Sequence, residues 1–249
     1  MRVLLLGGTT EAGHLAQALA DAGVDAVYSY AGRTDHPPLP PIPQRIGGFG
    51  GVEGLAAWLR AERITHVIDA THPFAAQISR HAVAACAALT VPLMGLVRAP
   101  WTAVPGDRWT AVPDLAAAVA ALPEAPANVF LAIGRQEAAA FAAAPRHRYL
   151  LRLVDPDKVA ALPDATTIIA RGPFTTGGDL ALMQTHAIHL VVARNAGGDG
   201  ARAKLDAARA LGLPVILIDR PASAAGRVTA GTVAGVIDWL TGHSAPLGV

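Results

Sequence analysis

Short apolar runs alternate with Ala-rich helical patterns along almost the whole of this 249-residue chain. The predicted strands are residues 3–6, 26–30, 44–46, 66–70, 92–97, 109–112, 129–133, 149–154, 166–170, 189–193 and 215–218. The predicted helices are residues 12–22, 52–62, 75–89, 115–122, 136–143, 176–185, 201–211 and 229–241. This alternation predicts an α/β fold with mainly parallel strands that are covered by helices on both faces.

The number of strands indicates how the chain divides. One open, twisted sheet rarely holds more than about ten strands, so we expect two Rossmann-like lobes with a ligand cleft between them. Pro100 and Pro105 interrupt the periodicity, which predicts a first domain over residues 1–99 and a second over residues 107–249. A TIM barrel is less favoured, because its phosphate site usually lies late in the chain.

Composition excludes several classes of protein. The net charge of +1 argues against a general surface for nucleic acids or membranes. The single cysteine, Cys86, cannot form an internal disulfide and is expected to be a buried apolar residue, with a nucleophilic role as the weaker alternative. The apolar start is too short for a signal peptide and no run matches a membrane span, so we expect a cytoplasmic protein.

A glycine-rich stretch follows the first predicted strand. It reads Gly7-Gly8-Thr9-Thr10-Glu11-Ala12 and leads directly into the first predicted helix. In dinucleotide-binding folds such a turn brings backbone N–H groups close to a pyrophosphate, and the positive end of the helix faces its charge. The spacing is not G-x-G-x-x-G, so a tight turn without a ligand is the alternative.

The end of the second predicted strand bears on the choice of cofactor. In many such folds an acidic residue there binds the ribose hydroxyls of NAD. This chain instead has Arg33, directly after Ala31-Gly32. A guanidinium suits the 2′-phosphate of NADP, so the sequence favours NADPH over NADH. A solvated surface charge is the alternative for Arg33.

The stretch after the fourth predicted strand reads Asp69-Ala70-Thr71-His72-Pro73-Phe74-Ala75. Pro73 fits the first turn of the next helix, and Thr71 or His72 is expected to cap that helix. His72 is the only side chain in this turn that titrates near neutral pH, which makes it the predicted proton donor or polar anchor. A histidine that only forms a hydrogen bond at a helix start is the alternative, and Asp69 is expected to brace the loop.

Arginines recur at the ends of later predicted strands, as Arg98, Arg135, Arg152, Arg171, Arg194 and Arg220. Only 16% of the chain is charged, so this repetition predicts a cleft for a polyanionic ligand.

The stretch Arg194-Asn195-Ala196-Gly197-Gly198 forms a second glycine-rich turn, with Lys204 in the following helix. Its N–H groups and Lys204 are suited to a phosphate or carboxylate. The histidines lack metal-ligand spacing, so no metal site is expected.

Taken together, these stretches resemble the precorrin-6A reductases of cobalamin biosynthesis. The matching stretches are residues 7–12, 31–34, 47–51, 69–75 and 194–221, in the order found in the family and over most of the chain. Residues 69–75 are the most specific of them. One departure lies in the second glycine turn, where the family typically has Lys-Asn-Ser-Gly-Gly and this chain has Ala196 in place of the serine.

The resemblance implies an NADPH-dependent reduction of one carbon–carbon double bond in precorrin-6A, giving precorrin-6B. The many carboxylates of such a tetrapyrrole would account for the repeated arginines, and neither nucleic acid nor membrane is an expected partner. Two alternatives remain at this stage: an NADPH-dependent reductase of another small anionic substrate, and a non-catalytic NADPH-sensing module.

With the resemblance, the predicted site has three groups of residues. The predicted catalytic residue is His72. The predicted cofactor-binding residues are Gly7, Gly8, Thr9, Thr10, Glu11, Ala12, Arg33, Thr34, Gly47, Gly48 and Phe49. The predicted substrate-binding residues are Thr71, Pro73, Phe74, Arg98, Arg135, Arg171, Arg194, Asn195, Gly197, Gly198 and Lys204.

Overall fold

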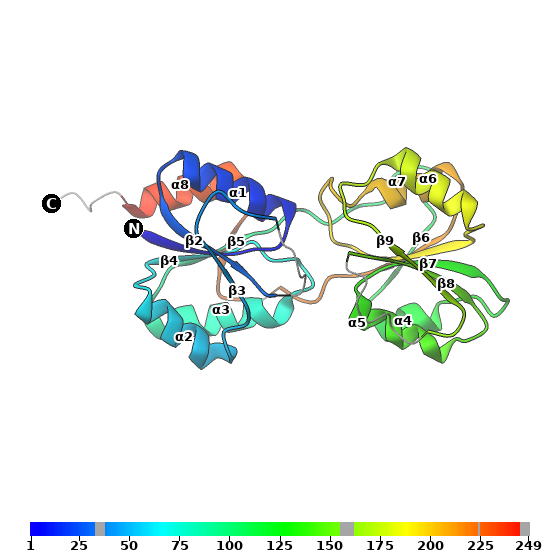
Figure 1. Ribbon diagram of the computed structural model, residues 1–249, viewed down its shortest axis with the longest axis horizontal. Helices are drawn as coiled ribbons and strands as arrows, with labels where there is room; N and C mark the ends of the chain where they lie inside the picture. The colour runs from blue at the N-terminus through cyan, green and yellow to red at the C-terminus, as the bar shows by residue number, and fades with distance from the viewer. Residues whose placement is uncertain (33–37, 155–161, 224, 245–249) are drawn as a thin grey trace. The chain divides into compact units, whose positions relative to one another are not determined.

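The chain forms two compact units, each built on its own sheet (Figure 1). The computed structural model describes residues 1–32, 38–154, 162–223 and 225–244. The first unit comprises Met1–Ala99 and Ala222–Val249, and the second comprises Pro100–Pro221. None of the described helices is both long and apolar enough to cross a membrane.

The first unit has a six-stranded parallel sheet in the order β3-β2-β1-β4-β5-β12. Its strands are β1 (Arg2–Leu6), β2 (Asp25–Tyr30), β3 (Gln44–Ile46), β4 (His66–Asp69), β5 (Leu93–Leu96) and β12 (Val228–Ala230). Its helices are α1 (Thr10–Asp21), α2 (Gly51–Ala61), α3 (Ala76–Leu89) and α8 (Val233–Ser244). Helices α1 and α8 cover one face of the sheet, while α2 and α3 cover the other (Figure 1).

The second unit has a six-stranded parallel sheet in the order β6-β11-β10-β7-β8-β9. Its strands are β6 (Trp109–Val112), β7 (Asn128–Ala132), β8 (Arg148–Leu153), β9 (Ala165–Ile169), β10 (Leu190–Arg194) and β11 (Val215–Ile218). Its helices are α4 (Leu115–Ala120), α5 (Arg135–Ala138), which continues as a 3₁₀ turn (Ala139–Ala143), α6 (Thr176–Thr185) and α7 (Ala203–Ala210). Figure 1 shows α6 and α7 on one face and α4 and α5 on the other.

Both sheets have the strand order 3-2-1-4-5-6 of a doubly wound dinucleotide-binding fold. The chain supplies the sixth strand differently in the two cases. In the first unit this strand is β12, formed after the chain has returned from the second unit. In the second unit it is β6, the first strand that the chain forms there. The predicted fold class, two Rossmann-like lobes with parallel sheets, is confirmed.

The predicted extent of the second domain, residues 107–249, is wrong for its last part. Residues 222–249 belong to the first unit. Val228 of β12 pairs in parallel with Met94 of β5, and Val236 and Leu240 of α8 lie in the same apolar core as Leu15 of α1. The periodicity of a segment indicates its secondary structure but not which sheet it joins. The sequence pattern therefore did not predict that residues 222–249 belong to the first unit.

The end of the chain also differs locally from the prediction. Residues 229–241 were expected to form one helix, whereas Val228–Ala230 is strand β12 and α8 begins at Val233. Strand β12 is only three residues long and half-exposed at the edge of the sheet, so it lacks the apolar run that marks the other strands. The eleven predicted strands are all present, with no end shifted by more than one residue.

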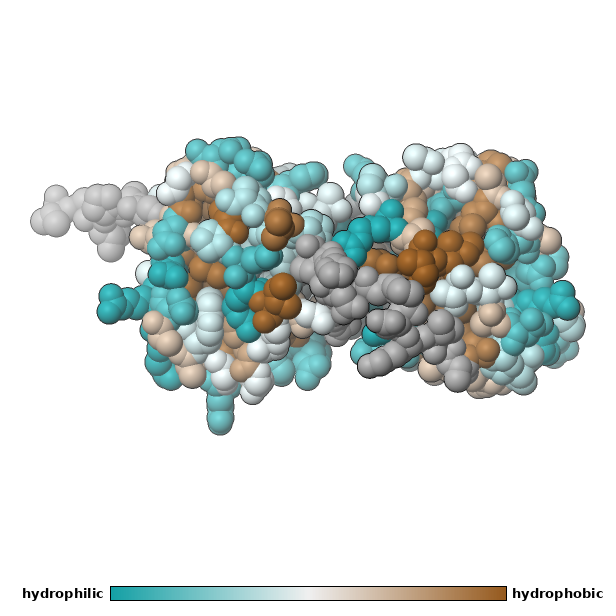
Figure 2. Space-filling view, in the orientation of Figure 1, coloured by the Kyte–Doolittle hydropathy of each residue, from teal (hydrophilic) through white to brown (hydrophobic). Residues whose placement is uncertain are grey.

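The core of each unit is built from aliphatic strands and Ala-rich helix faces. In β1, Val3, Leu4 and Leu5 are completely buried, as expected for a central strand covered on both faces. The edge strand β9 is different, since Ile169 is 45% exposed. Figure 2 shows an apolar strip on the second unit where Figure 1 draws β8 and β9.

Candidate functional site

The glycine turn after β1 is shaped by a buried tyrosine of β2. A Cβ atom on Gly7 would lie 2.1 Å from Cζ of Tyr28, so only glycine fits beneath that ring. Gly8 has open space around it but a φ of +112°, which favours glycine for its backbone conformation. The Gly8 N–H donates a hydrogen bond of 2.8 Å to Oη of Tyr28. Burial raises the pKa of Tyr28, so its hydroxyl stays neutral and holds the turn.

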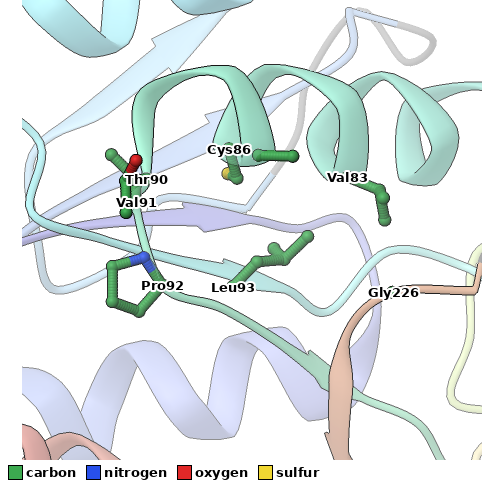
Figure 3. A pocket seen from close by; sticks show the side chains of 8 residues that line it. Val83, Cys86, Thr90, Val91, Pro92, Leu93 and Gly226 are labelled. Atoms are coloured by element: carbon green, nitrogen blue, oxygen red, sulfur yellow. The ribbon is translucent and has the colours of Figure 1, made fainter.

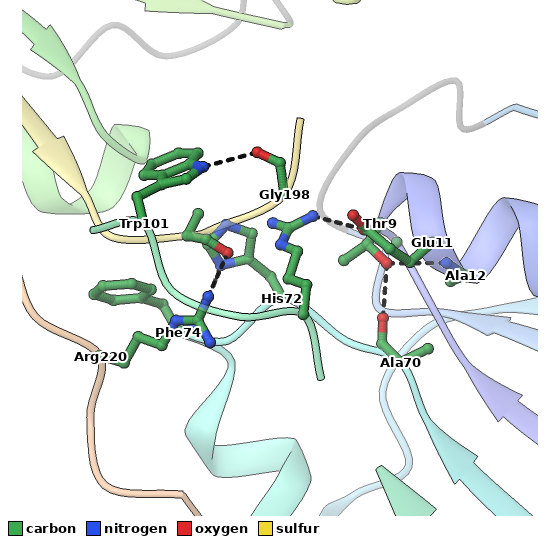
Figure 4. A network of polar contacts seen from close by, with 12 residues as sticks. Thr9, Glu11, Ala12, Ala70, His72, Phe74, Trp101, Gly198 and Arg220 are labelled. Carbon is green, nitrogen blue, oxygen red and sulfur yellow. Dashed lines mark hydrogen bonds and ion pairs between the residues drawn. The ribbon is translucent and has the colours of Figure 1, made fainter. Parts of the chain in front are cut away.

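Thr9 fixes the start of α1 (Figure 4). Its Oγ1 accepts a hydrogen bond of 3.1 Å from the Ala12 N–H and donates one of 2.9 Å to the carbonyl oxygen of Ala70. This N-cap therefore joins the end of β1 to the end of β4, where the strand order of the sheet reverses. Ligands of doubly wound folds bind at this switch point.

Glu11, in the first turn of α1, is paired within the first unit. Nη1 of Arg98 donates to Oε2 of Glu11 at 2.6 Å (Figure 4), and both side chains are largely buried. The pair neutralises a carboxylate that would otherwise repel an anion at this helix N-terminus. It also engages Arg98, which was predicted to bind substrate. Ala12 is completely buried in the core beneath the turn and contributes packing.

Asp69 braces the loop after β4, as predicted. Its Oδ1 accepts hydrogen bonds from Thr71, at 3.1 Å from the N–H and 2.6 Å from Oγ1. Its Oδ2 is paired with Nη1 of Arg227, just before β12, and the side chains of both ions are more than nine-tenths buried. Arg227 was missed in the sequence because its partner precedes it by 158 residues.

His72 and Phe74 lie in the turn between β4 and α3. The Phe74 N–H donates to Nδ1 of His72 at 3.3 Å, and their ring centroids are 5.8 Å apart. Helix α3 starts at Ala76 and has no side-chain cap. The predicted caps, Thr71 or His72, are therefore wrong, and Pro73 lies in the turn before the helix rather than in its first turn.

The predicted wall of the cofactor pocket is organised by Arg45 of β3. Its guanidinium donates to the carbonyl oxygens of Gly47 and Gly48 and lies 3.9 Å from the ring centroid of Phe49. Arg45 was not predicted from the sequence, where an arginine two residues before a glycine pair was the available signal. Arg33 and Thr34, predicted to bind the 2′-phosphate, lie outside the described residues.

In the second unit, the turn after β7 contains a carboxylate. The Gly134 N–H donates to Oε2 of Glu137 at 3.0 Å, and Glu137 is paired with Nη1 of Arg194 at 3.2 Å. Arg194 was predicted to bind substrate but is engaged by this carboxylate. Arg135 begins α5 and is half-buried, whereas Arg171 is exposed after β9.

The second glycine turn, after β10, is held by side chains of its own unit. Asn195 accepts a hydrogen bond of 2.8 Å from the Trp101 N–H and donates one of 3.1 Å to the Trp101 carbonyl oxygen. The Trp101 indole N–H donates to the carbonyl oxygen of Gly198, and Arg220 donates to those of Asn195 and Ala196 (Figure 4). The Asn195 amide, predicted to bind substrate, is therefore used within the fold.

Lys204 is also used within the fold. Only 7% of this residue is exposed; its Nζ donates to the carbonyl oxygen of Ala201 at 2.5 Å and lies 5.1 Å from the ring centroid of Trp101. The prediction that it faces a ligand is not supported by this burial. Gly197 and Gly198 have φ values of +66° and +73°, which explains why glycine is needed at both positions.

The six strand-end arginines do not form one set of anion-binding side chains. Arg98 and Arg194 are paired with glutamates, Arg152 is paired with Asp179 beneath the ring of Phe174, and Arg220 donates to backbone carbonyl groups. Their spacing in the sequence does not reveal these carboxylates and carbonyl groups, which come from other elements. The side chains of these four arginines are therefore engaged by other groups of the chain, and the polyanion interpretation stays a prediction.

A cavity of about 360 Å³ lies elsewhere in the first unit (Figure 3). It is lined mainly by apolar residues of α3 and of the segment leading into β5, together with Cys86, Thr90 and Gly226. Cys86 is 2% exposed, and burial raises the pKa of its thiol to about 12. It is a buried apolar residue as predicted, and its burial disfavours a thiolate nucleophile. The described residues contain no group of three or more side chains suited to bind a metal.

Comparison with known proteins gives consistent matches over the whole chain. A family model described as precorrin-6x reductase CbiJ/CobK matches residues 2–241. The precorrin-6A reductase of Rhodobacter capsulatus is 64% identical, with 100% of this chain and 99% of that protein covered. The precorrin-6A reductase of Rhodococcus erythropolis is 48% identical, covering 96% and 97%.

The other comparisons extend this result. The cobalt-precorrin-6A reductase of Priestia megaterium is 29% identical, with 88% of this chain and 90% of that protein covered. A solved structure of CobK precorrin-6A reductase matches with a TM-score of 0.95 and 63% sequence identity, covering 100% of each chain. The fold is therefore shared along the full length of the chain.

Proposed function

The chain belongs to the precorrin-6x reductase family of cobalamin biosynthesis, and we propose that it uses NADPH bound at the β1–α1 turn. It is an oxidoreductase. The family match favours this activity over a reductase of another small substrate or a non-catalytic sensor. The relatives at 64% and 48% identity are named for precorrin-6A, which supports a cobalt-free substrate.

The observation that carries the cofactor proposal is the shape of the first glycine turn. Helix α1 has twelve residues, a Thr9 cap and a first-turn glutamate that Arg98 neutralises. Its N-terminus therefore presents a positive dipole to the switch point without a competing free carboxylate. The residues present fit a pyrophosphate at residues 7–12. The sequence predicts Arg33 and Thr34 as contacts of the 2′-phosphate, which would favour NADPH over NADH.

We assign the proton-handling role to His72. Because its Nδ1 accepts the Phe74 N–H, the neutral ring carries its proton on Nε2. The Asp69–Thr71 contacts hold the loop before it in one conformation. The chemistry that bound NADPH supplies is a hydride for one carbon of the double bond. As the imidazolium, His72 is suited to protonate the neighbouring carbon, and as the neutral ring its Nε2–H is suited to orient the water that does so.

For the substrate carboxylates we propose a smaller set of residues than the sequence indicated. Arg135 and Arg171 remain proposed contacts in the second unit, and Thr71, Pro73 and Phe74 remain proposed contacts in the first. The backbone of Gly197 and Gly198 also remains a proposed contact of the substrate carboxylates. Arg98, Arg194, Asn195 and Lys204 instead support the fold around these positions.

The direct test is an anaerobic incubation of the purified protein with NADPH and precorrin-6A, followed by NADPH absorbance and product mass. We expect NADPH consumption with a gain of two hydrogens in the macrocycle. Consumption of NADH at the same rate, at subsaturating cofactor, would contradict the cofactor assignment. No turnover with either cofactor would contradict the activity.

A further inference from the structure

Arg45 lies in β3 beside the carboxyl end of β2. Its Nη1 donates hydrogen bonds to Oγ of Ser29 at 2.7 Å and to the carbonyl oxygen of Gly47 at 2.9 Å. Its Nη2 donates to the carbonyl oxygen of Gly48 at 3.1 Å. The ring of Phe49 lies 3.9 Å below the guanidinium carbon. The side chain is therefore held rigidly, in one orientation, by the loop after β3.

Within the part of the chain that the structure describes, the charge of Arg45 has no anionic partner. Among the described residues, no carboxylate oxygen lies within 4.0 Å of its guanidinium nitrogens, and all its hydrogen-bond acceptors are neutral. Two other arginines of the same unit, Arg98 and Arg227, are paired with Glu11 and Asp69. Arg45 is half-buried, and this partial burial lowers the pKa of its guanidinium.

The guanidinium also keeps donors for a ligand. An arginine has five N–H donors, and the three hydrogen bonds of Arg45 leave two of them for an anion. A phosphate accepts such donors in pairs. A half-buried cation with fixed neutral neighbours and remaining donors is a suitable partner for a dianionic group.

The position of Arg45 indicates which anionic group of the cofactor it would bind. Ser29, its partner in β2, accepts the Gly7 N–H at 3.1 Å through its carbonyl oxygen. Arg45 is thus one residue removed from the turn that we propose for the pyrophosphate. In this fold the end of the second strand lies beside the ribose of a dinucleotide bound at the first turn.

We propose that Arg45 binds the 2′-phosphate of NADPH, beside the sequence-predicted contacts Arg33 and Thr34, and thereby contributes to the preference for NADPH over NADH. This proposal rests on the function proposed above. Stacking of the guanidinium on the adenine ring is the competing arrangement, and it would favour both cofactors equally because they share that ring.

Binding measurements by calorimetry separate these arrangements. The variants are Arg45→Gln, which removes the charge, and Arg45→Lys, which keeps it. The matched control is Arg60→Gln, which makes the same charge change at an exposed position of α2 in the same unit. The probes are NADPH, NADH, adenosine 2′,5′-bisphosphate and 5′-AMP.

For Arg45→Gln we expect the Kd of NADPH and of the bisphosphate to rise about 10- to 100-fold, as for a lost charge-assisted contact. The Kd of NADH and of 5′-AMP should change less than about threefold on the same scale. Arg45→Lys should recover part of the loss, and Arg60→Gln should behave like the wild type.

Equal losses for all four ligands would overturn the proposal, because they would indicate adenine stacking or a collapsed loop. An unchanged preference for NADPH in Arg45→Gln would overturn it as well, while leaving the proposed function intact. A wild-type protein that binds NADH as tightly as NADPH would instead contradict the proposed cofactor itself.

Discussion

The two units share one strand order but differ at the first turn after the central strand. In the first unit, β1 leads through Gly7 and Gly8 into a twelve-residue helix with a threonine cap. In the second unit, β7 leads through Gly134 into α5, which has four residues. The Gly134 N–H donates to Glu137, so a carboxylate of the chain itself occupies the position of an anionic ligand.

This difference shows that topology alone does not create a dinucleotide site. The helix dipole and the unsatisfied N–H groups of a helix start attract anions only when the helix is long enough and no carboxylate competes. The first unit meets both conditions because Arg98 neutralises Glu11. In the second unit Glu137 already accepts from the turn and pairs with Arg194.

The largest expected effect concerns the ion pairs of the two units. Replacing Arg227 by Met leaves Asp69 buried without its partner, which should cost about 3–5 kcal/mol in the first unit. The matched change, Arg194→Met, breaks a pair that is about a quarter to a third exposed (23% and 32%) and should cost about 1 kcal/mol. Hydrogen–deuterium exchange, followed for peptides of each unit, measures the loss of unfolding free energy in both variants. Similar losses of stability for Arg227→Met and Arg194→Met would contradict the proposed difference between the two ion pairs.

The next effect concerns the loops after β4 and β10. His72 follows β4, whereas the equivalent turn after β10 holds Ala196 and two glycines. His72→Gln should lower the single-turnover rate of hydride transfer about 100-fold, the lower range for general acid catalysis. The Kd of NADPH should not change. An unchanged single-turnover rate would remove His72 from the mechanism.

The two turn glycines should respond differently to an added methyl group. In Gly7→Ala the new Cβ would overlap the buried ring of Tyr28, at a cost of about 1–3 kcal/mol and with weaker cofactor binding. In Gly134→Ala the nearest atom, at 3.1 Å, is Oε2 of the flexible Glu137 side chain. That variant should retain wild-type thermal stability and cofactor affinity. Thermal unfolding and cofactor titration of both variants test the contrast.

The smallest expected effect is that of the helix caps. Thr9→Ala removes the side-chain N-cap of α1. Asp114→Ala removes a side-chain N-cap of the same kind from α4 in the second unit. Each should lower stability by about 1 kcal/mol. Only Thr9→Ala should also weaken cofactor binding, because Thr9 positions the turn. A loss of cofactor affinity in Asp114→Ala would argue against a site confined to the β1–α1 turn.

The sequence predicted the parts of the fold that depend on local pattern. Continuous apolar runs such as residues 3–6 and 215–218 identified the central strands, because such strands are buried on both faces. The return of β12 to the first sheet was not predictable in this way. The choice of a sheet by a short, half-exposed strand depends on contacts with distant residues, here with β5.

In the site, too, the features that depend on nearby residues were predictable and those that depend on distant residues were not. The glycine turn and the bracing role of Asp69 were predicted, since both depend on neighbours within a few residues. The roles of the arginines were not, because their carboxylates lie far away in the chain; Glu11 and Arg98 are 87 positions apart. A strand-end arginine indicates a charge at the edge of the sheet but not what neutralises it.

The central claim is that the dinucleotide binds at the β1–α1 turn of the first unit and not at the equivalent β7–α5 turn of the second. Hydrogen–deuterium exchange with and without saturating NADPH tests it most directly. We predict slower exchange of the backbone amides in residues 7–12 and unchanged exchange in residues 133–138. Protection of residues 133–138, or no change in residues 7–12, would contradict the account.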